Sequence, residues 1–259
     1  MENLKQIEEA LNLYLRLQTF PVAIKMVTSA EEIPQKARMP RRDLKVIMPV
    51  CQAITIARRY GWVMAMGKED MSCPLAAITL GFAPAKAKFL DGSFRFPVWA
   101  EGKEIRRKFV QTLPRLEYGK YSFVIAAPLS RTSFEPQVVV IYGNPAQITR
   151  LGQSAMLANG SPIKGEITGG AACANYIAKT ILSSECQFVL GGGGDRIFAA
   201  VREDEMGFAM PMNKVEGIIE QLKIIHKYGE RIPTIPFLRY TPDSPPAFNE
   251  LWDYLNQPD

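Results

Sequence analysis

Three of the four cysteines share a local setting that could do chemistry. Each stands beside Gly, Pro or Ser where a helix is predicted to begin: Cys51 after Met48-Pro49-Val50, Cys73 between Ser72 and Pro74, and Cys173 after Gly169-Gly170. The first N–H groups of a helix carry partial positive charge and have no partner inside the helix, so they can stabilise a thiolate, a metal-bound sulfur or a cluster sulfide. Gly169 and Gly170 would let the backbone approach such a group closely.

The spacing of these cysteines leaves three interpretations open. They lie 22 and 100 residues apart in turn, without the close C-x-x-C pairs of zinc ribbons and ferredoxins. They could be three buried apolar side chains, ligands of a shared metal or iron–sulfur site, or, for Cys173 alone, a reactive nucleophile. Cys186 lacks the helix-start setting, although it could complete a set of four.

Among inorganic groups, an iron–sulfur cluster is favoured over zinc. A structural zinc ion usually takes four protein ligands, and the only histidine, His226, lies among apolar residues of a predicted helix. Three thiolates with an open fourth position suit a cluster that binds a small ligand or passes electrons. Cys-His hydrolysis would depend on that single histidine, and no G-x-S-x-G motif is present.

A second glycine run supports a rival function. Gly191 to Gly194 follows a predicted strand and leads into Asp195-Arg196, a pattern that could form an anion-binding nest although it lacks the P-loop signature. Asn175, Tyr176 and Arg196 could line a pocket beside Cys173. On this interpretation the protein is a cofactor-free small-molecule binding or regulatory protein whose cysteines are merely buried.

The composition bounds the class of protein. The chain has 259 residues, 47% of them apolar, which is enough for a full core. We expect no membrane segment, because the N-terminus is polar and no run of eighteen apolar residues occurs, and the few cysteines indicate a cytoplasmic protein. The net charge of +5 is not clustered with aromatic residues, so nucleic acid is not an expected partner.

The elements that would position the cysteines follow from hydrophobic periodicity. We expect helices over 2–17, 52–61, 72–81 with Ser72 as N-cap, 103–113, 145–157, after Cys173, over 214–227 and around 248–255. Strands are expected over 20–27, 44–48, 62–66, 122–127, 137–142 and 187–190, an extended stretch over 94–99, and a hairpin of 197–201 with 207–210.

These elements predict an α/β protein with a mixed β-sheet and flanking helices, and an α+β arrangement is also compatible. We expect one compact domain over 1–259, built from two intimately packed halves, 1–118 and 119–230. A Pro-rich C-terminal arm, 231–259, could pack on the body of the protein or on a second subunit. A faint internal repeat relates the segment after Cys51 to the segment after Cys173 and would bring their turns face to face.

Nearly the whole chain resembles a prokaryotic family known as domain of unknown function 169. The resemblance lies in Phe20-Pro21-Val22-Ala23-Ile24-Lys25, Cys51 before an Ala-rich helix, Cys73-Pro74 with Leu80-Gly81, and Gly169-Gly170 before Cys173. It implies a cytoplasmic bacterial or archaeal protein, often of anaerobes, with Cys51, Cys73 and Cys173 as site candidates. It supplies no substrate or reaction. The sequence therefore predicts a cysteine-ligated metal or iron–sulfur protein with a redox partner or small-molecule ligand.

Overall fold

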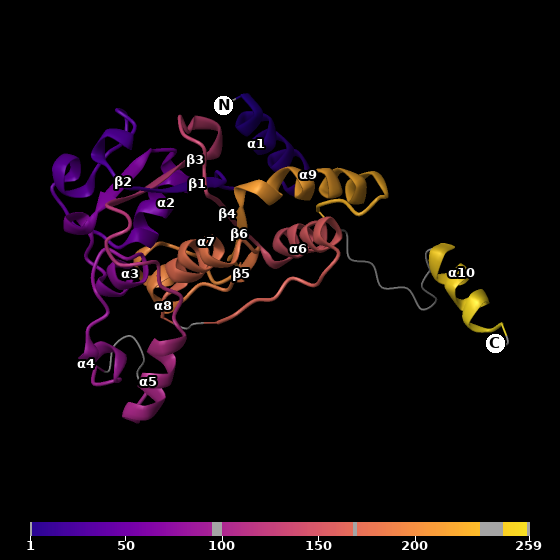
Figure 1. Cartoon of the computed structure of the whole chain (residues 1–259). Coiled ribbons are helices and arrows are strands. Elements are labelled where there is room, and N and C mark those ends of the chain that lie inside the picture. Colours follow the sequence, from indigo (N-terminus) through magenta and orange to yellow (C-terminus); the bar gives the residue numbers. More distant parts are fainter. Residues whose placement is uncertain (1, 95–99, 168–169, 234–245, 258–259) are drawn as a thin grey trace.

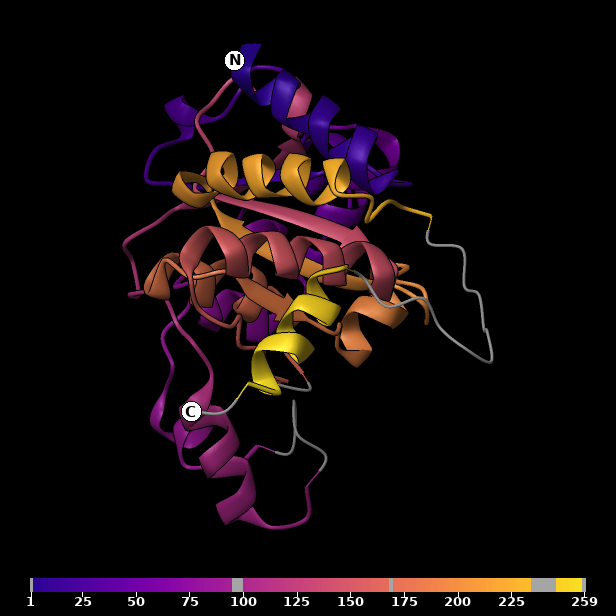
Figure 2. The same ribbon diagram turned by 90° about the vertical axis from the view of Figure 1, so that its right-hand side faces the viewer.

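The computed structural model describes residues 2–94, 100–167, 170–233 and 246–257. A six-stranded sheet runs through its centre, with helices on both faces (Figures 1 and 2). Its strands are β1 (Val22–Val27), β2 (Met64–Gly67), β3 (Phe123–Pro128), β4 (Val138–Gly143), β5 (Gln187–Val189) and β6 (Met206–Pro211), in the spatial order β2-β3-β1-β4-β6-β5.

The expected α/β fold is confirmed, but the sheet is not mixed as expected, because all of the named strand pairs are antiparallel. Among the described residues, parallel pairing is confined to isolated bridges such as that between Met48 and Met71. Strand β1 lies between two strands that come much later in the chain, with Val27 opposite Phe123 and Ile24 opposite Val138. Strands from before and after residue 118 therefore share one sheet.

One face of the sheet is covered by the three longest helices. These are α1 (Glu2–Leu15), α6 (Pro145–Asn159) and α9 (Met212–Lys227), whose apolar side chains pack on Ala23, Val139 and Phe208 (Figure 2). Each helix carries apolar residues at helical spacing, as in the buried Leu4, Ile7, Leu11 and Leu15 of α1, so its burial follows directly from the sequence.

The other face is covered by shorter elements that carry the candidate site. They are α2 (Val50–Tyr60), α3 (Pro74–Thr79), the π-helical turn η5 (Ala174–Lys179) with α7 (Thr180–Ser183), and α8 (Gly193–Phe198). Their core residues pack on Ile24, Val140 and Ala209, which alternate along the strands with residues facing the first layer.

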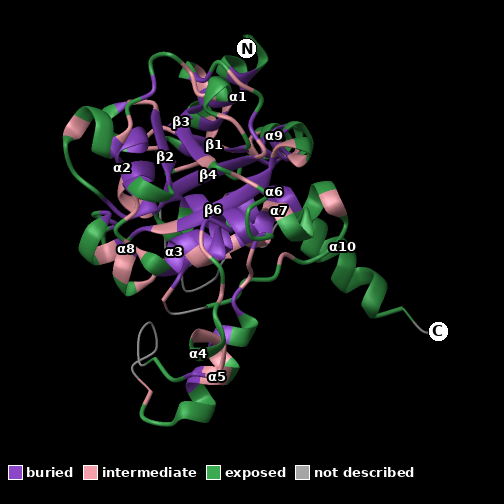
Figure 3. Cartoon of the chain, turned by 60° about the vertical axis from the view of Figure 1, so that its left-hand side comes forward, coloured by how far each residue is buried: buried purple, intermediate pink, exposed green. Residues whose placement is uncertain are grey.

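The remaining elements lie at the margins. Short turns η1 (Ala30–Glu32), η2 (Pro40–Leu44), η3 (Lys68–Asp70) and η4 (Leu129–Arg131) connect the strands, and α4 (Ala87–Leu90) and α5 (Lys103–Thr112) project from the body. The C-terminal α10 (Pro246–Leu255) stands apart, with every residue exposed (Figure 3).

Two predicted strands are wrong. Residues 44–48 do not form one, because Pro40–Leu44 make a π-helical turn ended by Lys45 at φ 59°, and Val46 and Ile47 are 48% and 56% exposed. The first arm of the predicted hairpin, 197–201, instead begins inside α8, where Ile197 is 76% exposed. In both cases apolar residues that suggested a buried strand lie on the surface. Of the extended stretch 94–99, residues 95–99 lie outside the described residues.

Candidate functional site

The structure brings Cys51, Cys73 and Cys173 onto the same face of the sheet. Cys51 is the second residue of α2, Cys73 is the N-cap of α3 in place of the predicted Ser72, and Cys173 is the N-cap of η5. All three contact the core cluster of that face. Each of Cys51 and Cys73 is close enough to Cys173 to raise its pKa, and Cys73 also raises that of Cys51. Residues far apart in sequence therefore form one group of thiols.

Burial sets the protonation of these thiols. Loss of solvent, then Asp195 and Cys73, raise the pKa of Cys51 to about 12. Burial also raises the pKa of Cys173 well above its ordinary value. The helix-start amides act in the lowering direction, as the sequence suggested, but desolvation outweighs them. Cys51 and Cys173 are therefore protonated near neutral pH, and their thiolates would form there only with a compensating positive charge.

Asp195 is a buried carboxyl that interacts with both the thiols and two nearby tyrosines. It is 3% exposed, in the first turn of α8, and accepts a hydrogen bond from the Gly192 N–H at 3.4 Å. Burial raises the pKa of its carboxyl to about 6, against the lowering effects of the Gly192 amide, Arg58, Arg196 and the Cys51 thiol. The negative charge of Asp195 raises the pKa values of Cys51 and Cys173. It also raises those of two buried tyrosines.

Those tyrosines, Tyr142 and Tyr176, are polar groups left unsatisfied inside the core. Their ring centroids are 5.3 Å apart, they are 3% and 1% exposed, and neither hydroxyl has a hydrogen-bond partner among the described residues. Tyr176 packs against the backbone of Gly207, where an added Cβ would lie 2.3 Å from its ring and hydroxyl. Native structures rarely leave buried hydroxyls unpaired, and here each hydroxyl acts on the pKa of the other, so the two tyrosines form one buried polar cluster.

A buried ion pair fixes the helix of Cys51 relative to the helix of Asp195. Arg58, two turns after Cys51, is fully buried and donates to the two carboxylate oxygens of Glu205 through Nη1 and Nη2, at 3.0 and 3.2 Å. The guanidinium also lies 4.2 Å from the ring centroid of Tyr142 and donates to the Ala200 carbonyl just after α8. Next to it, the Thr55 hydroxyl donates to the Ala199 carbonyl at 2.6 Å. The relative position of α2 and α8 is thus built into the core.

The remaining predicted site residues are placed differently. Cys186 is 3% exposed in the core cluster on the opposite face of the sheet, so it is separated from the three thiols by the strands. His226 lies on α9 on that same opposite side, against the ring of Tyr14. Gly170 is half-buried just before Ala171 and η5, and Gly169 lies outside the described residues. Within the described ranges, no three His, Cys, Asp or Glu side chains are arranged to hold a metal ion as they stand.

Sequence reasoning did not identify Arg58, Tyr142 or the central place of Asp195. Arg58 could have been found, because it lies seven residues after Cys51 and therefore on the same side of a helix. Tyr142 shows no such signal, since its strand reads as a continuous apolar run.

Comparison with known proteins assigns the chain to a family. Residues 10–221 match the model of the DUF169 family, described as Uncharacterised ArCR. The chain belongs to this family. A relative, Uncharacterized protein MJ0308 of Methanocaldococcus jannaschii, is 26% identical over 211 residues, covering 78% of this chain and 86% of that protein. No solved structure matches the chain. None of the described helices is long and apolar enough to cross a membrane.

Proposed function

We propose that this DUF169 protein is a cysteine-ligated metalloprotein in which Cys51, Cys73 and Cys173 hold an iron–sulfur cluster for redox or small-ligand chemistry. The observation that carries the proposal is the convergence of three thiols from three separate helix starts. A cluster held this way passes electrons or presents an iron to a small ligand.

The residues around the thiols suit such a group. Cys51 and Cys173, whose pKa values are raised, lose their protons when they bind a cation, and the helix-start amides can donate hydrogen bonds to cluster sulfur. The apolar surroundings of Cys173 keep water away. The unpaired hydroxyls of Tyr142 and Tyr176 are donors that a group bound near Asp195 could use. These features support the proposal. The described residues do not form a preformed site for a single metal ion.

The rival anion-binding function at Gly191–Arg196 is less well supported. The Asp195 carboxylate already accepts from the Gly192 N–H, and it would repel an anion there. The Arg196 guanidinium is used by the carbonyls of Leu190 and Arg202. Asp195 and Arg196 therefore already hydrogen-bond to backbone groups of this segment rather than facing a ligand.

Two further parts of the proposal concern the setting of the protein. We place it in the cytoplasm, because its four cysteines are free thiols. We also propose that the C-terminal arm packs on a second subunit, because α10 exposes Phe248, Leu251 and Trp252 by 54% to 63% on one side. A redox partner or small-molecule ligand remains part of the proposed role.

The test is metal analysis of protein purified without oxygen, together with its visible spectrum. We expect iron and inorganic sulfide in fixed ratio to protein and a sulfide-to-iron absorption band. Cys51→Ser, Cys73→Ser and Cys173→Ser should each abolish loading. Cys186→Ser is the matched control, because it removes a buried thiol on the other face of the sheet and should load normally.

Two outcomes would contradict the cluster. Colourless protein without stoichiometric iron, sulfide or zinc would refute any shared inorganic site. Zinc without sulfide, lost in the same three variants, would replace the cluster with a zinc site. Urea unfolding of every variant separates lost ligation from lost folding.

A further inference from the structure

An apolar groove lies beside α3, the helix that begins at Cys73. Its volume is about 280 Å³, and its walls come from α3, from α4 and from the segments on either side of α4. Leu75, Ile78, Phe89 and Phe94 supply apolar side chains, and Lys86 is the one charged residue among the described lining residues. We call it the α3 groove.

The α3 groove adjoins the thiol site. Leu75 belongs to a small apolar cluster that includes Ala174, the residue after Cys173, and both Cys73 and Phe89 pack against that cluster. Cys73 itself is only partly buried. A partner seated in the α3 groove would therefore cover the helix start that carries Cys73.

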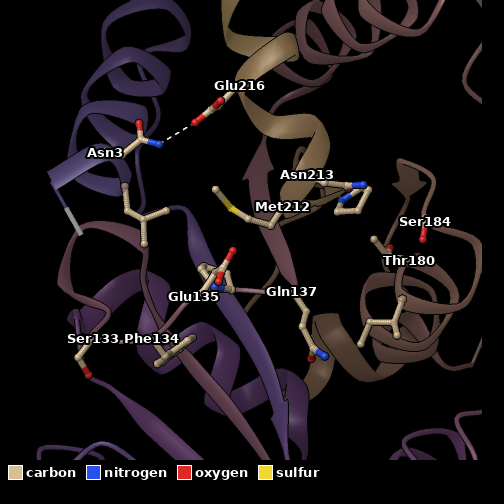
Figure 4. Close-up of a pocket in the computed structure, with 14 residues that line it drawn as sticks. Asn3, Ser133, Phe134, Glu135, Gln137, Thr180, Ser184, Met212, Asn213 and Glu216 are labelled. Atoms are coloured by element: carbon tan, nitrogen blue, oxygen red, sulfur yellow. Dashed lines mark hydrogen bonds between the residues drawn. The ribbon is translucent and has the colours of Figure 1, made fainter.

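A larger cavity of about 820 Å³, at the start of α9, lacks these features (Figure 4). Its lining is largely polar, and its Glu216 already accepts a hydrogen bond from Asn3. Among the described lining residues it has no buried polar side chain without a partner. The α3 groove is instead an exposed apolar surface, which is typical of a docking site.

The C-terminal helix α10 presents a matching apolar surface. Phe248, Leu251, Trp252 and Leu255 follow the spacing i, i+3, i+4, i+7, which places them on one side of the helix. Each of them is more than half exposed. An amphipathic helix that inserts such side chains into an apolar groove is a common mode of recognition.

The charges of the two surfaces are opposite in sign. The helix α10 carries Glu250 and Asp253 and no basic residue. On the groove side, Lys86 and Lys88 are exposed, and neither is in an ion pair within the described part of the chain. The groove therefore attracts α10, whereas a second α10 or an anionic membrane surface would repel it.

The α10 of the same chain is remote from its own groove. Figure 1 shows α10 and α4 on opposite sides of the molecule, and every described residue of α10 is exposed. A second copy of the chain, related by a twofold axis, can place its α10 in the groove and receive the first α10 in return. Such an exchange covers both apolar surfaces of both copies.

We propose that the α3 groove binds α10 of a second copy of this chain, so that two copies exchange their C-terminal helices beside Cys73. This inference rests on the second-subunit packing proposed above and requires no cofactor. It adds the surface that receives the arm, and it makes the cover over Cys73 a contribution of the partner copy.

The test is sedimentation equilibrium of the full chain across the micromolar range, where we expect a dimer. Trp252→Glu places a charge on the apolar side of α10, and Phe94→Glu places one in the groove at a residue that is 56% exposed and so can change without loss of folding. Each should raise the dimer dissociation constant by at least about thirtyfold, the effect of losing an interface hot spot. Leu13→Glu, at an exposed apolar residue of α1, is the control and should dimerise like the wild type.

An equal mixture of the Trp252→Glu and Phe94→Glu variants tests the exchange itself. The first variant keeps an intact groove and the second keeps an intact α10, so one of the two contacts can form between them. We expect a heterodimer that is tighter than the dimer of either variant alone. A mixture that is no more associated than its components would overturn the exchange.

The outcomes separate this inference from the packing on which it rests. A wild type that stays monomeric would overturn both. A dimer that is lost in Trp252→Glu and kept in Phe94→Glu would overturn the groove assignment alone.

Labelling of Cys73 by iodoacetamide in the metal-free protein gives a second measurement. The dimer should protect Cys73, and Trp252→Glu should be labelled there several-fold faster. Equal rates in the dimeric wild type and in this variant would show that α10 binds elsewhere. Faster labelling of the variant with a monomeric wild type would place α10 in the groove of its own chain and overturn the exchange.

Discussion

Arg58 and Glu205 form a two-pronged ion pair inside the core, with nitrogen–oxygen distances of 3.0 and 3.2 Å and exposed side-chain fractions of 0% and 5%. The pair joins the Cys51 helix to the segment that follows the Asp195 helix. Arg59 and the Arg202 N–H also bind Glu205, so the carboxylate holds three separate groups. The geometry of the thiol site therefore depends on a contact made outside it.

Replacing only one residue of this ion pair should lower the free energy of unfolding more than replacing both residues. Glu205→Leu leaves the buried Arg58 uncompensated, and we expect a loss of about 3–5 kcal/mol in the free energy of unfolding. Adding Arg58→Leu removes the stranded charge and should recover part of that loss. Urea unfolding of the single and double variants measures the difference, and a double variant less stable than the single one would argue against a buried-charge penalty.

The stability of the metal-free protein should depend on pH through Asp195. Its pKa is raised by burial to about 6 from an ordinary 3.8, so the folded state binds this proton more tightly than the unfolded state. The associated stability is complete below pH 3.8 and is lost as pH rises through 6. Asp195→Asn should equal the wild type near pH 4 and exceed it by about 2–3 kcal/mol above pH 7.

Urea midpoints of both proteins from pH 4 to 8 test this sign. Asp204→Asn, in an exposed loop, is the control and should follow the wild type throughout. A wild type that gains stability relative to Asp195→Asn as pH rises would contradict the raised pKa.

The contact between Tyr176 and Gly207 should tolerate no side chain. A Cβ at Gly207 would lie 2.3 Å from the Tyr176 ring, so Gly207→Ala should destabilise the fold by about 2 kcal/mol or more. Gly193→Ala is the matched control in α8, because nothing lies within 4 Å of its added Cβ. It should be neutral or stabilise by up to about 1 kcal/mol, the usual helical preference for Ala. Thermal melts should therefore show a lowered melting temperature for Gly207→Ala and an unchanged or raised one for Gly193→Ala.

Three of the four thiols, Cys51, Cys173 and Cys186, should be poor nucleophiles in the metal-free protein. With a pKa of about 12 for Cys51, only about one molecule in ten thousand carries its thiolate at pH 8. Cys173 and Cys186 are also buried with raised pKa values. Iodoacetamide labelling followed by peptide mass spectrometry should show little modification of these three before unfolding in urea. Rapid, selective labelling of Cys173 near neutral pH would instead support the nucleophile interpretation.

The helix starts at Cys51 and Cys73 were predictable because a proline lies beside each cysteine, Pro49 before α2 and Pro74 at the start of α3. The end of α2 was predictable from Gly61, which has φ 71°, a conformation that favours glycine. The long amphipathic helices and the strands flanked by turns were predictable for the same reason, since periodicity and punctuation are local signals.

The arrangement around Asp195 was not predictable in this way. Ile197 and Phe198 suggested a strand, yet a capping interaction of Asp195 with the Gly192 N–H starts a helix there and leaves both apolar side chains exposed. The unpaired hydroxyls of Tyr142 and Tyr176 depend on tertiary packing between a strand and a helical turn. No local pattern encodes such a contact.

The position of β1 between β3 and β4 has a consequence for how the chain acquires its structure. Residues 22–27 leave the ribosome early in synthesis. The two strands that pair with them, β3 and β4, begin only at Phe123 and Val138. The central strand therefore has no partner until nearly half of the chain has been synthesised. Because long-range pairing is slow, we expect folding on the scale of milliseconds to seconds and a nascent chain that depends on chaperones to shield this apolar segment.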